Sequence, residues 1–97
     1  MNPPYGKAIG RWLTKALKES ALGATVVCLI PARTDTAWWQ DVVMRATEIR
    51  LVRGRLRFVG AAAPAPFPSA IAIFRPGKAG RCCRVLAWNW RLLQIRA

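Results

Sequence analysis

Four residues near the start of the chain form a stiff group of hydrogen-bond acceptors. Asn2, Pro3, Pro4 and Tyr5 follow Met1 directly. Each proline fixes its own φ angle and pushes the residue before it into an extended conformation. Because proline has no N–H, the Pro3 carbonyl and the Asn2 side-chain oxygen stand free as acceptors. Two acceptors held in this way are well placed to hydrogen-bond the exocyclic amino group of a nucleobase such as adenine.

The same tetrapeptide suggests a reaction at that amino group. Hydrogen bonds to the Asn2 side chain and the Pro3 carbonyl favour a more tetrahedral nitrogen, whose lone pair can attack an electrophilic methyl group in line. Tyr5 would stack on the base, which is worth about 1–3 kcal/mol. The base must first leave the duplex, because pairing buries its amino group. The alternative interpretation is a proline-rich turn without a chemical role.

An amphipathic helix over residues 7–21 is predicted directly after this group. Its apolar residues recur at helical spacing; they are Ile9, Trp12, Leu13, Ala16, Leu17 and Ala21. Four basic side chains line the other side: Lys7, Arg11, Lys15 and Lys18. Gly23 stands where glycine commonly ends a helix. Since Trp12 belongs to the apolar stripe, we expect it in the core.

Residues 24–30 are continuously apolar and rich in β-branched side chains. Such a run predicts a strand buried on both faces, as in a parallel sheet. Cys28 lies within it and is expected as a small core residue, and Pro31 should end the strand. A helix followed by such a strand indicates an α/β fold.

The next loop should lead into a second helix, over about residues 36–46. Thr34 or Asp35 can cap that helix, because both side chains carry an oxygen that accepts from backbone N–H groups. Trp38 and Trp39 are adjacent within it, so at most one of them should point fully inward.

Two strands with alternating arginines are predicted next, at residues 49–52 and 55–58, flanking a tight turn at 53–54. The alternation leaves one face of this hairpin buried and the other basic. Residues 69–74 form a final apolar strand after a Gly/Ala/Pro loop. The tail, residues 76–97, fits either a strand or a helix, and its pattern does not decide between them.

The chain is strongly basic, and its charge is uneven. It has 97 residues, a size typical of one small domain, and its formal net charge is +12. Residues 1–48 carry six basic and four acidic side chains, whereas residues 49–97 carry ten basic and none acidic. A phosphate-binding surface for nucleic acid follows from this balance. A solvated basic face is the alternative, and Trp88 and Trp90 could stack on bases or pack in the core.

Several classes of function are excluded by residue content. The chain has no histidine, so neither a Ser-His-Asp triad nor a histidine metal site can form. No metal site is expected from its three cysteines, because Cys82 and Cys83 are adjacent. An odd number of cysteines without framework spacing fits a reducing cytoplasm. The longest uncharged stretch, residues 59–74, is too short and proline-broken to span a bilayer, so no membrane partner is expected.

The tetrapeptide is one of several segments that point to the same enzyme family. The others are Gly6 through Trp12, residues 23–27 (Gly-Ala-Thr-Val-Val), residues 29–36 (Leu-Ile-Pro-Ala-Arg-Thr-Asp-Thr) with Trp39, residues 48–50 (Glu-Ile-Arg), residues 53–58 (Arg-Gly-Arg-Leu-Arg-Phe) and residues 65–69 (Ala-Pro-Phe-Pro-Ser). In combination they resemble the phage-type DNA N6-adenine methyltransferases over about residues 2–75.

This resemblance implies a Rossmann-like methyltransferase sheet that uses S-adenosylmethionine, with residues 2–5 (Asn2, Pro3, Pro4 and Tyr5) as the catalytic loop that holds the target base. Ligands of such sheets bind beyond the carboxyl ends of the strands. Arg33, Thr34 and Asp35 are then candidates for substrate contact. Their local alternatives are helix caps for Thr34 or Asp35 and a structural ion pair for Arg33.

DNA is the partner that the resemblance implies for the basic strand pair. Arg53, Arg55 and Arg57 are candidates for contact with DNA phosphate, and a solvated hairpin face is the alternative. A non-catalytic basic module that binds nucleic acid remains the competing function.

The order of the segments leads to an expectation about completeness. In the family, a strand and most of the cofactor site precede the catalytic motif, whereas here only Met1 does. We therefore expect residues 1–75 to be the C-terminal part of a methyltransferase domain without its cofactor half, and residues 76–97 to be a basic tail. Alone, such a bacterial or phage-encoded cytoplasmic chain should methylate little. Its apolar strand at residues 24–30 should leave an edge that pairs with another chain.

Overall fold

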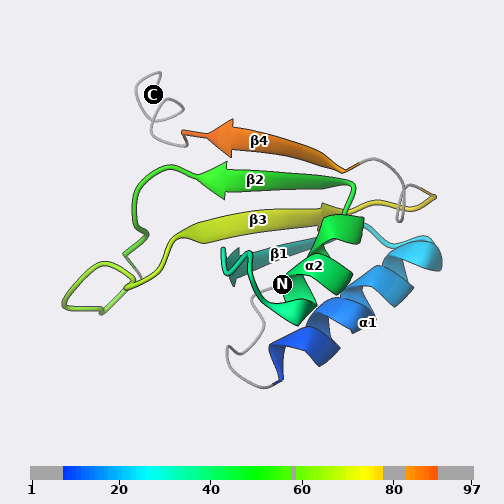
Figure 1. The fold of residues 1–97 in the computed structure, drawn as a ribbon, viewed down its shortest axis with the longest axis horizontal. Coiled ribbons are helices and arrows are strands. Elements are labelled where there is room, and N and C mark those ends of the chain that lie inside the picture. Colours follow the sequence, from blue (N-terminus) through cyan, green and yellow to red (C-terminus); the bar gives the residue numbers. More distant parts are fainter. Residues whose placement is uncertain (1–7, 58, 78–82, 90–97) are drawn as a thin grey trace.

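The computed structural model of the chain describes residues 8–57, 59–77 and 83–89 (Figure 1). The elements in chain order are α1 (Ile9–Ala21), β1 (Val26–Pro31), α2 (Ala37–Asp41), the 3₁₀ turn η1 (Val43–Arg45), β2 (Glu48–Val52), β3 (Ser69–Phe74) and β4 (Arg84–Trp88). The predicted α/β class is therefore confirmed at the level of a small mixed sheet with helices. None of the helices in these described ranges has the length and apolar character needed to cross a membrane.

The four strands form one sheet in the order β1-β3-β2-β4. β3 runs antiparallel to both of its neighbours, and β2 runs parallel to β4. It follows that β1, β2 and β4 all point in the same direction, so their carboxyl ends lie at one edge of the sheet (Figure 1). This edge is where the sequence places ligand binding.

The prediction for the first strand is correct in position and wrong in environment. β1 ends at Pro31 as expected, but its described neighbour β3 is antiparallel rather than parallel. It is also not buried on both faces, because Val27 is 45% exposed while Cys28 and Ile30 are fully buried. The physical reason is that the helices pack on only one side of this strand.

α1 packs its apolar stripe on the sheet. Ile9, Leu13 and Ala16 are buried. Trp12 was expected with them but is 40% exposed. Successive residues of a helix are rotated by about 100°, so the residue just before Leu13 points well away from the stripe that Leu13 fills.

One glycine ends α1 and another lies where α1 meets α2. Gly23 follows the helix with a φ angle of 111°, and its N–H donates to the Ser20 carbonyl. This confirms the predicted glycine stop. Within the helix, a Cβ built on Gly10 would lie 3.4 Å from the Cβ of Trp38, so α1 and α2 approach closely there.

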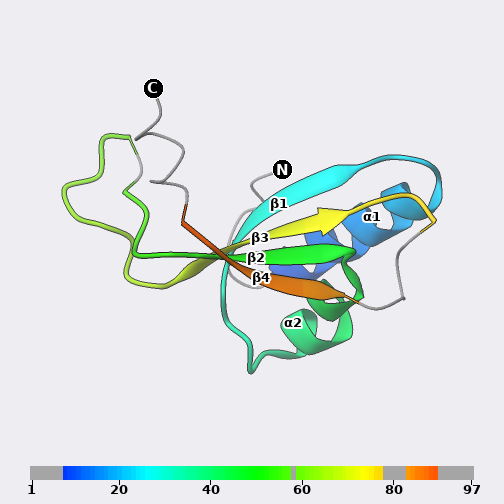
Figure 2. The same cartoon turned by 90° about the horizontal axis from the view of Figure 1, so that it is seen from above.

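One hydrophobic core lies between the helices and one face of the sheet. Figures 1 and 2 show both helices on this same face. The buried cluster comprises Ile9, Leu13, Ala16, Cys28, Ile30, Trp39, Val43, Ala46, Ile49, Ala70, Ala72 and Phe74. The strand residues of this cluster lie on one face of the sheet, because they are either register partners on neighbouring strands or alternate residues of one strand. This is the face that the helices cover. Cys28 is confirmed as a core residue.

The second helix is shorter than predicted. α2 ends at Asp41, and the tighter turn η1 replaces the rest of the expected helix. Ala46 is then extended, with φ −62° and ψ 155°, which allows β2 to start two residues later. Of the adjacent tryptophans, Trp39 is buried and Trp38 is half-buried, as predicted.

The predicted hairpin after β2 is wrong. Gly54 does adopt a turn conformation with φ 76°, but residues 55–57 belong to no strand. The Ala65 N–H donates to the Leu56 carbonyl at 2.7 Å, which closes a loop instead. β2 pairs with β3 and β4 on its two sides, so it has no edge left for residues 55–57. β3 is also not the last strand, since β4 follows in the tail.

Candidate nucleic-acid interface

Two loops meet at the carboxyl edge of the sheet. The first follows β1 over residues 32–36, and the second connects β2 to β3 over residues 53–68. The Ala32 N–H donates to the Pro68 carbonyl at 2.8 Å. The Arg33 guanidinium lies over the Phe67 ring, 5.8 Å from its centroid. The edge therefore presents a cation and an aromatic ring that come from different loops.

The loop after β1 is fixed by its own hydrogen bonds. The Thr36 hydroxyl donates to the Arg33 carbonyl at 2.7 Å and accepts from the Trp39 N–H at 3.3 Å. The Gln40 amide donates to the Thr34 carbonyl at 3.1 Å. These bonds occupy the backbone and the Thr36 side chain, so the exposed side chains of the loop are not needed to hold its shape.

Arg33, Thr34 and Asp35 are all exposed in this loop. The helix cap is Thr36, so the proposed capping roles of Thr34 and Asp35 are wrong. Among the described residues, the ion pairs do not include Arg33. Its guanidinium keeps donors available while resting on Phe67, a geometry suited to an anionic or planar ligand. The sequence suggested no role for Phe67, because its neighbour Arg33 is far away along the chain.

Arg53, Arg55 and Arg57 lie in the loop after β2, and all three are exposed. The Arg53 N–H donates to the Trp88 carbonyl at 2.9 Å, which attaches the start of this loop to the end of β4. The three arginines therefore belong to the same edge as Arg33, although no contact joins them to it in the described structure.

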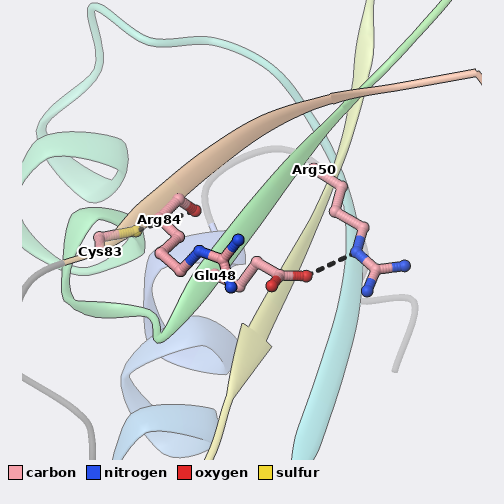
Figure 3. A network of polar contacts seen from close by, with 4 residues as sticks. All are labelled: Glu48, Arg50, Cys83 and Arg84. Carbon is pink, nitrogen blue, oxygen red and sulfur yellow. Dashed lines mark hydrogen bonds and ion pairs between the residues drawn. The ribbon is translucent and has the colours of Figure 1, made fainter.

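An ion pair between a buried carboxylate and a partly exposed arginine lies on the sheet face opposite the helices. The Arg50 Nε donates to the Glu48 carboxylate at 2.6 Å (Figure 3). Glu48 is only 6% exposed. The hydrogen bond from Arg50 lowers the pKa of Glu48, and the charges of Arg50, Arg75 and Arg84 act in the same direction against the opposing effect of burial. Glu48 is thus held as a carboxylate, which does not suit a proton donor.

Trp88 belongs to the same group of contacts. The Arg50 guanidinium lies over its ring, 5.7 Å from the centroid, and the ring is half-buried. A base stacking on Trp88 would compete with Arg50 for that face. Trp90, the other candidate for stacking, lies outside the described residues.

Among the described residues, one buried side-chain oxygen has no hydrogen-bond partner. The Ser69 hydroxyl, at the start of β3, makes no hydrogen bond although its oxygen is buried. Ser69 is the register partner of Pro31, so it lies directly beneath the loop that carries Arg33. A hydroxyl in this state has unused capacity to donate or accept.

The predicted catalytic loop cannot be placed. Asn2, Pro3, Pro4 and Tyr5 lie outside the described residues. Its nearest described element is α1, which begins only four residues after Tyr5.

The residues at this edge do not by themselves fit S-adenosylmethionine. Within the described ranges, β1 is the strand that leads directly into a helix, and residues 32–36 between them contain no glycine. A phosphate or cofactor turn of the Rossmann type needs glycines there for close approach. Thr34 and Asp35 could contact hydroxyl or amino groups, but they do not make a complete cofactor site. Groups of acidic or cysteine side chains able to hold a metal ion are likewise absent from the described part of the chain.

Comparison with known proteins adds one finding. A family model, described as DNA N-6-adenine-methyltransferase (Dam), matches residues 1–78. The matched span includes residues 2–5, both loops at the carboxyl edge and the first three strands of the sheet. Searches of curated proteins and of solved structures found no match.

Proposed function

The chain belongs to the DNA N-6-adenine-methyltransferase (Dam) family, and from this premise we propose that its activity is site-specific methylation of adenine N6 in DNA. The methyl group would come from S-adenosylmethionine, the donor that methyltransferases of this family imply. The observation that carries the proposal is the family match over residues 1–78, which contains the Asn-Pro-Pro-Tyr sequence.

Residues 2–5 hold the base in this proposal. The Asn2 side-chain oxygen and the Pro3 carbonyl each accept a hydrogen bond from the adenine amino group. Tyr5 stacks on the ring of the base after it has left the duplex. The two prolines keep the acceptors in place without an ordering step, because their φ angles are already fixed.

The carboxyl edge of the sheet contributes the remaining substrate contacts. Arg33, Thr34 and Asp35 bind the flipped nucleotide and its neighbours, and the exposed arginines 53, 55 and 57 (Arg53, Arg55, Arg57) bind DNA phosphates. The hydrogen bonds that shape residues 32–36 use the Thr36 side chain and the backbone rather than the side chains of Arg33, Thr34 and Asp35, which supports the first assignment. The attachment of the arginine loop to the same edge supports the second.

The described residues provide only part of a binding site for the methyl donor. Since the edge supplies no glycine turn for S-adenosylmethionine, we propose that residues 1–75 form the base-binding part of the methyltransferase unit and transfer methyl groups weakly or not at all alone. Residues 76–97 add a basic tail, which contributes β4 to the sheet. We expect this chain to act in the cytoplasm of a bacterium, from its own or a phage genome.

The decisive experiment compares adenine with purine, which lacks the amino group. Oligonucleotides carrying one or the other at an unpaired position are titrated against the purified chain. We expect adenine to bind roughly tenfold more tightly, because two hydrogen bonds of about 0.5–1.5 kcal/mol each are lost with purine. Asn2→Ala should reduce this preference to about threefold, because the Pro3 carbonyl still accepts one of the two hydrogen bonds. Asn2→Asp, which keeps an acceptor oxygen, should retain the preference. Equal binding of the two oligonucleotides by the unaltered chain would refute the proposed base recognition.

A non-catalytic basic module is the second candidate, and the exposure of Arg53, Arg55 and Arg57 favours it. In that case Asn2→Ala would change nothing. Replacing the three arginines with glutamine would abolish binding, and the affinity would depend steeply on salt for every sequence.

Association with another chain is also part of the proposal. The strand predicted to leave a free edge, residues 24–30, corresponds to β1, and β1 and β4 are the two outer strands of the described sheet. Within β4, Val85 and Leu86 are 49% and 37% exposed. An exposed apolar edge of this kind favours pairing with a strand of a second chain.

A further inference from the structure

The outer face of α1 carries a basic and aromatic surface that the proposed site does not use. We define the α1 surface as Arg11, Trp12, Lys15 and Lys18, all of which are exposed. The Lys15 ammonium lies 5.9 Å from the centroid of the Trp12 ring. The rotation of α1 thus exposes an aromatic ring beside cations, in place of the core position expected for it.

The spacing of the cations matches a phosphate backbone. Arg11, Lys15 and Lys18 follow one another by four and then three residues, which places them along one line of the helix. The rise of an α-helix spreads them over about 10 Å. A DNA strand carries one phosphate for about every 3.4 Å of helix axis, so about three phosphates of one strand lie along the length that the three cations cover.

The surface between these cations is concave. A groove of about 690 Å³ runs along α1, with Arg11, Thr14, Lys15 and Lys18 among its lining residues. The Thr14 hydroxyl donates to the Gly10 carbonyl at 2.8 Å, so the charged side chains provide the main donors toward a ligand. Glu19 lies at the far end, and it is the one acid in the lining.

A membrane surface is a poor alternative partner. Basic amphipathic helices bind membranes by burying their apolar face in the lipid. In α1 that face is already occupied, because Ile9, Leu13 and Ala16 are at most 2% exposed and belong to the core. Only the polar face with Trp12 is available, which suits a polyanion.

The α1 surface also lies close to the proposed reaction. Four residues separate Tyr5 from Ile9 along the chain, which limits the distance between their Cα atoms to about 14 Å. A duplex gripped along α1 would therefore pass near the residues that hold the flipped base.

We propose that the α1 surface binds the phosphate backbone of the DNA substrate. Arg11, Lys15 and Lys18 pair with phosphates, and Trp12 packs against the deoxyribose or an unstacked base beside them. This inference rests on the proposed function for the identity of the polyanion as DNA. It adds a second contact surface, separate from the arginines at the carboxyl edge of the sheet.

The test is a binding titration of duplex DNA across salt concentrations. The variant Arg11→Gln/Lys15→Gln/Lys18→Gln should bind at least roughly tenfold more weakly, and the salt dependence of log K should fall by about two to three units of slope. The charge-conserving variant Arg11→Lys/Lys15→Arg/Lys18→Arg should bind like the unaltered chain. Arg45→Gln, which removes an exposed charge from η1, should have little effect. Trp12→Leu should weaken binding without changing the slope.

Each other outcome has a definite meaning. If the glutamine variant binds with unchanged affinity and slope, the inference is wrong, whatever Asn2→Ala does. If it loses DNA binding while Asn2→Ala leaves the adenine preference unchanged, the α1 surface stands and the proposed base recognition fails. If it loses affinity only for vesicles containing anionic lipid, a membrane is the partner instead. Circular dichroism confirms folding, and Lys15→Gln alone replaces the triple variant if that one does not fold.

Discussion

At the scale of single residues, Glu48 shows how one carboxylate is built into a strongly basic chain. It is nearly buried, it accepts a hydrogen bond from Arg50, and Arg75 and Arg84 add favourable charge. Removing the partners of a charged group in such a place destabilises the fold, because the remaining charge is left nearly buried and unpaired. Its role is therefore structural, and it should appear in the pH dependence of stability.

Glu48→Gln should lower the free energy of unfolding near pH 7 by about 1 kcal/mol. The folded-state pKa of Glu48 is lowered from an ordinary value of 4.5, so the carboxylate stabilises the fold above about that pH. This contribution is lost as the pH falls from 4.5 through the lower folded value. Urea unfolding at pH 7 and pH 3 measures it.

The control for this experiment is Asp41→Asn, which removes an exposed carboxylate at the end of α2. It should change stability little at either pH. A deficit of Glu48→Gln that stayed the same at pH 3 and pH 7 would contradict the role of charge and indicate packing instead.

Residue patterns predicted part of the candidate site and missed its pairings. Arg33, Thr34 and Asp35 were correctly expected in a loop after a strand, but the cap proved to be Thr36. Any of several oxygen-bearing side chains can cap a helix, and only the chain path selects one. The contact of Arg33 with Phe67 joins residues far apart in sequence, so local spacing carries no signal for it.

At the scale of elements, periodicity located the strands well and their partners poorly. The alternation of arginine and apolar residues continues past β2, and it predicted a local hairpin at residues 49–58. Alternation states which side chains share a face, and it does not state which strand lies alongside. β3 and β4 take the two edges of β2, and residues 55–57 therefore form a loop.

The two glycines of α1 should respond oppositely to the same substitution. Gly23→Ala should lower the free energy of unfolding by about 1–2 kcal/mol, because its φ angle of 111° is strained for any residue with a Cβ. Gly10→Ala should raise it by about 0.5–1 kcal/mol, because alanine favours the helix interior and the nearest atom, the Trp38 Cβ, is at ordinary contact distance. Thermal unfolding measures both.

This pair serves as its own control, since both variants add one methyl group. A loss of stability in Gly10→Ala as large as in Gly23→Ala would show that α1 and α2 are packed too closely at Trp38 to accept it. In that case contact, rather than backbone conformation, sets the response of Gly10.

At the scale of the whole molecule, the helices cover one face of the sheet. Charged groups lie on the opposite face, at the carboxyl edge of the sheet and on the outer side of α1. The pattern of an amphipathic helix followed by an apolar strand was sufficient to predict the α/β class. The net charge predicted a polyanionic partner, because it is a sum over many residues. The strand order β1-β3-β2-β4 was not predictable. It depends on which long-range pairings bury most surface, and the single apolar run of each strand does not encode this.

The edge of β4 offers a direct test of association. Among the described residues, β4 pairs with β2 on one side, and the N–H groups of successive residues point to opposite sides of a strand. The Arg84 N–H donates to the Thr47 carbonyl beside β2, so the N–H groups of Val85 and Ala87 point to the outer side. Ala87→Pro should remove an outward donor, keep the pairing with β2, and shift the chain toward monomer in sedimentation velocity.

The matched control is Ala87→Val, which retains the N–H and should retain any association. If Ala87→Pro and Ala87→Val sediment alike as dimers, the contact between chains does not use this edge. A monomer at every concentration for the unaltered chain would remove association from the proposal altogether.

Cys28 lies in the middle of β1 and is completely enclosed by the core, and this burial raises the pKa of its thiol. A thiol reagent reacts with the thiolate and must reach the sulfur. Labelling of Cys28 therefore has to wait until β1 separates from the helices. The alkylation half-life of this one side chain therefore reports how often the sheet opens. A DNA duplex that stabilises the fold on binding should lengthen this half-life.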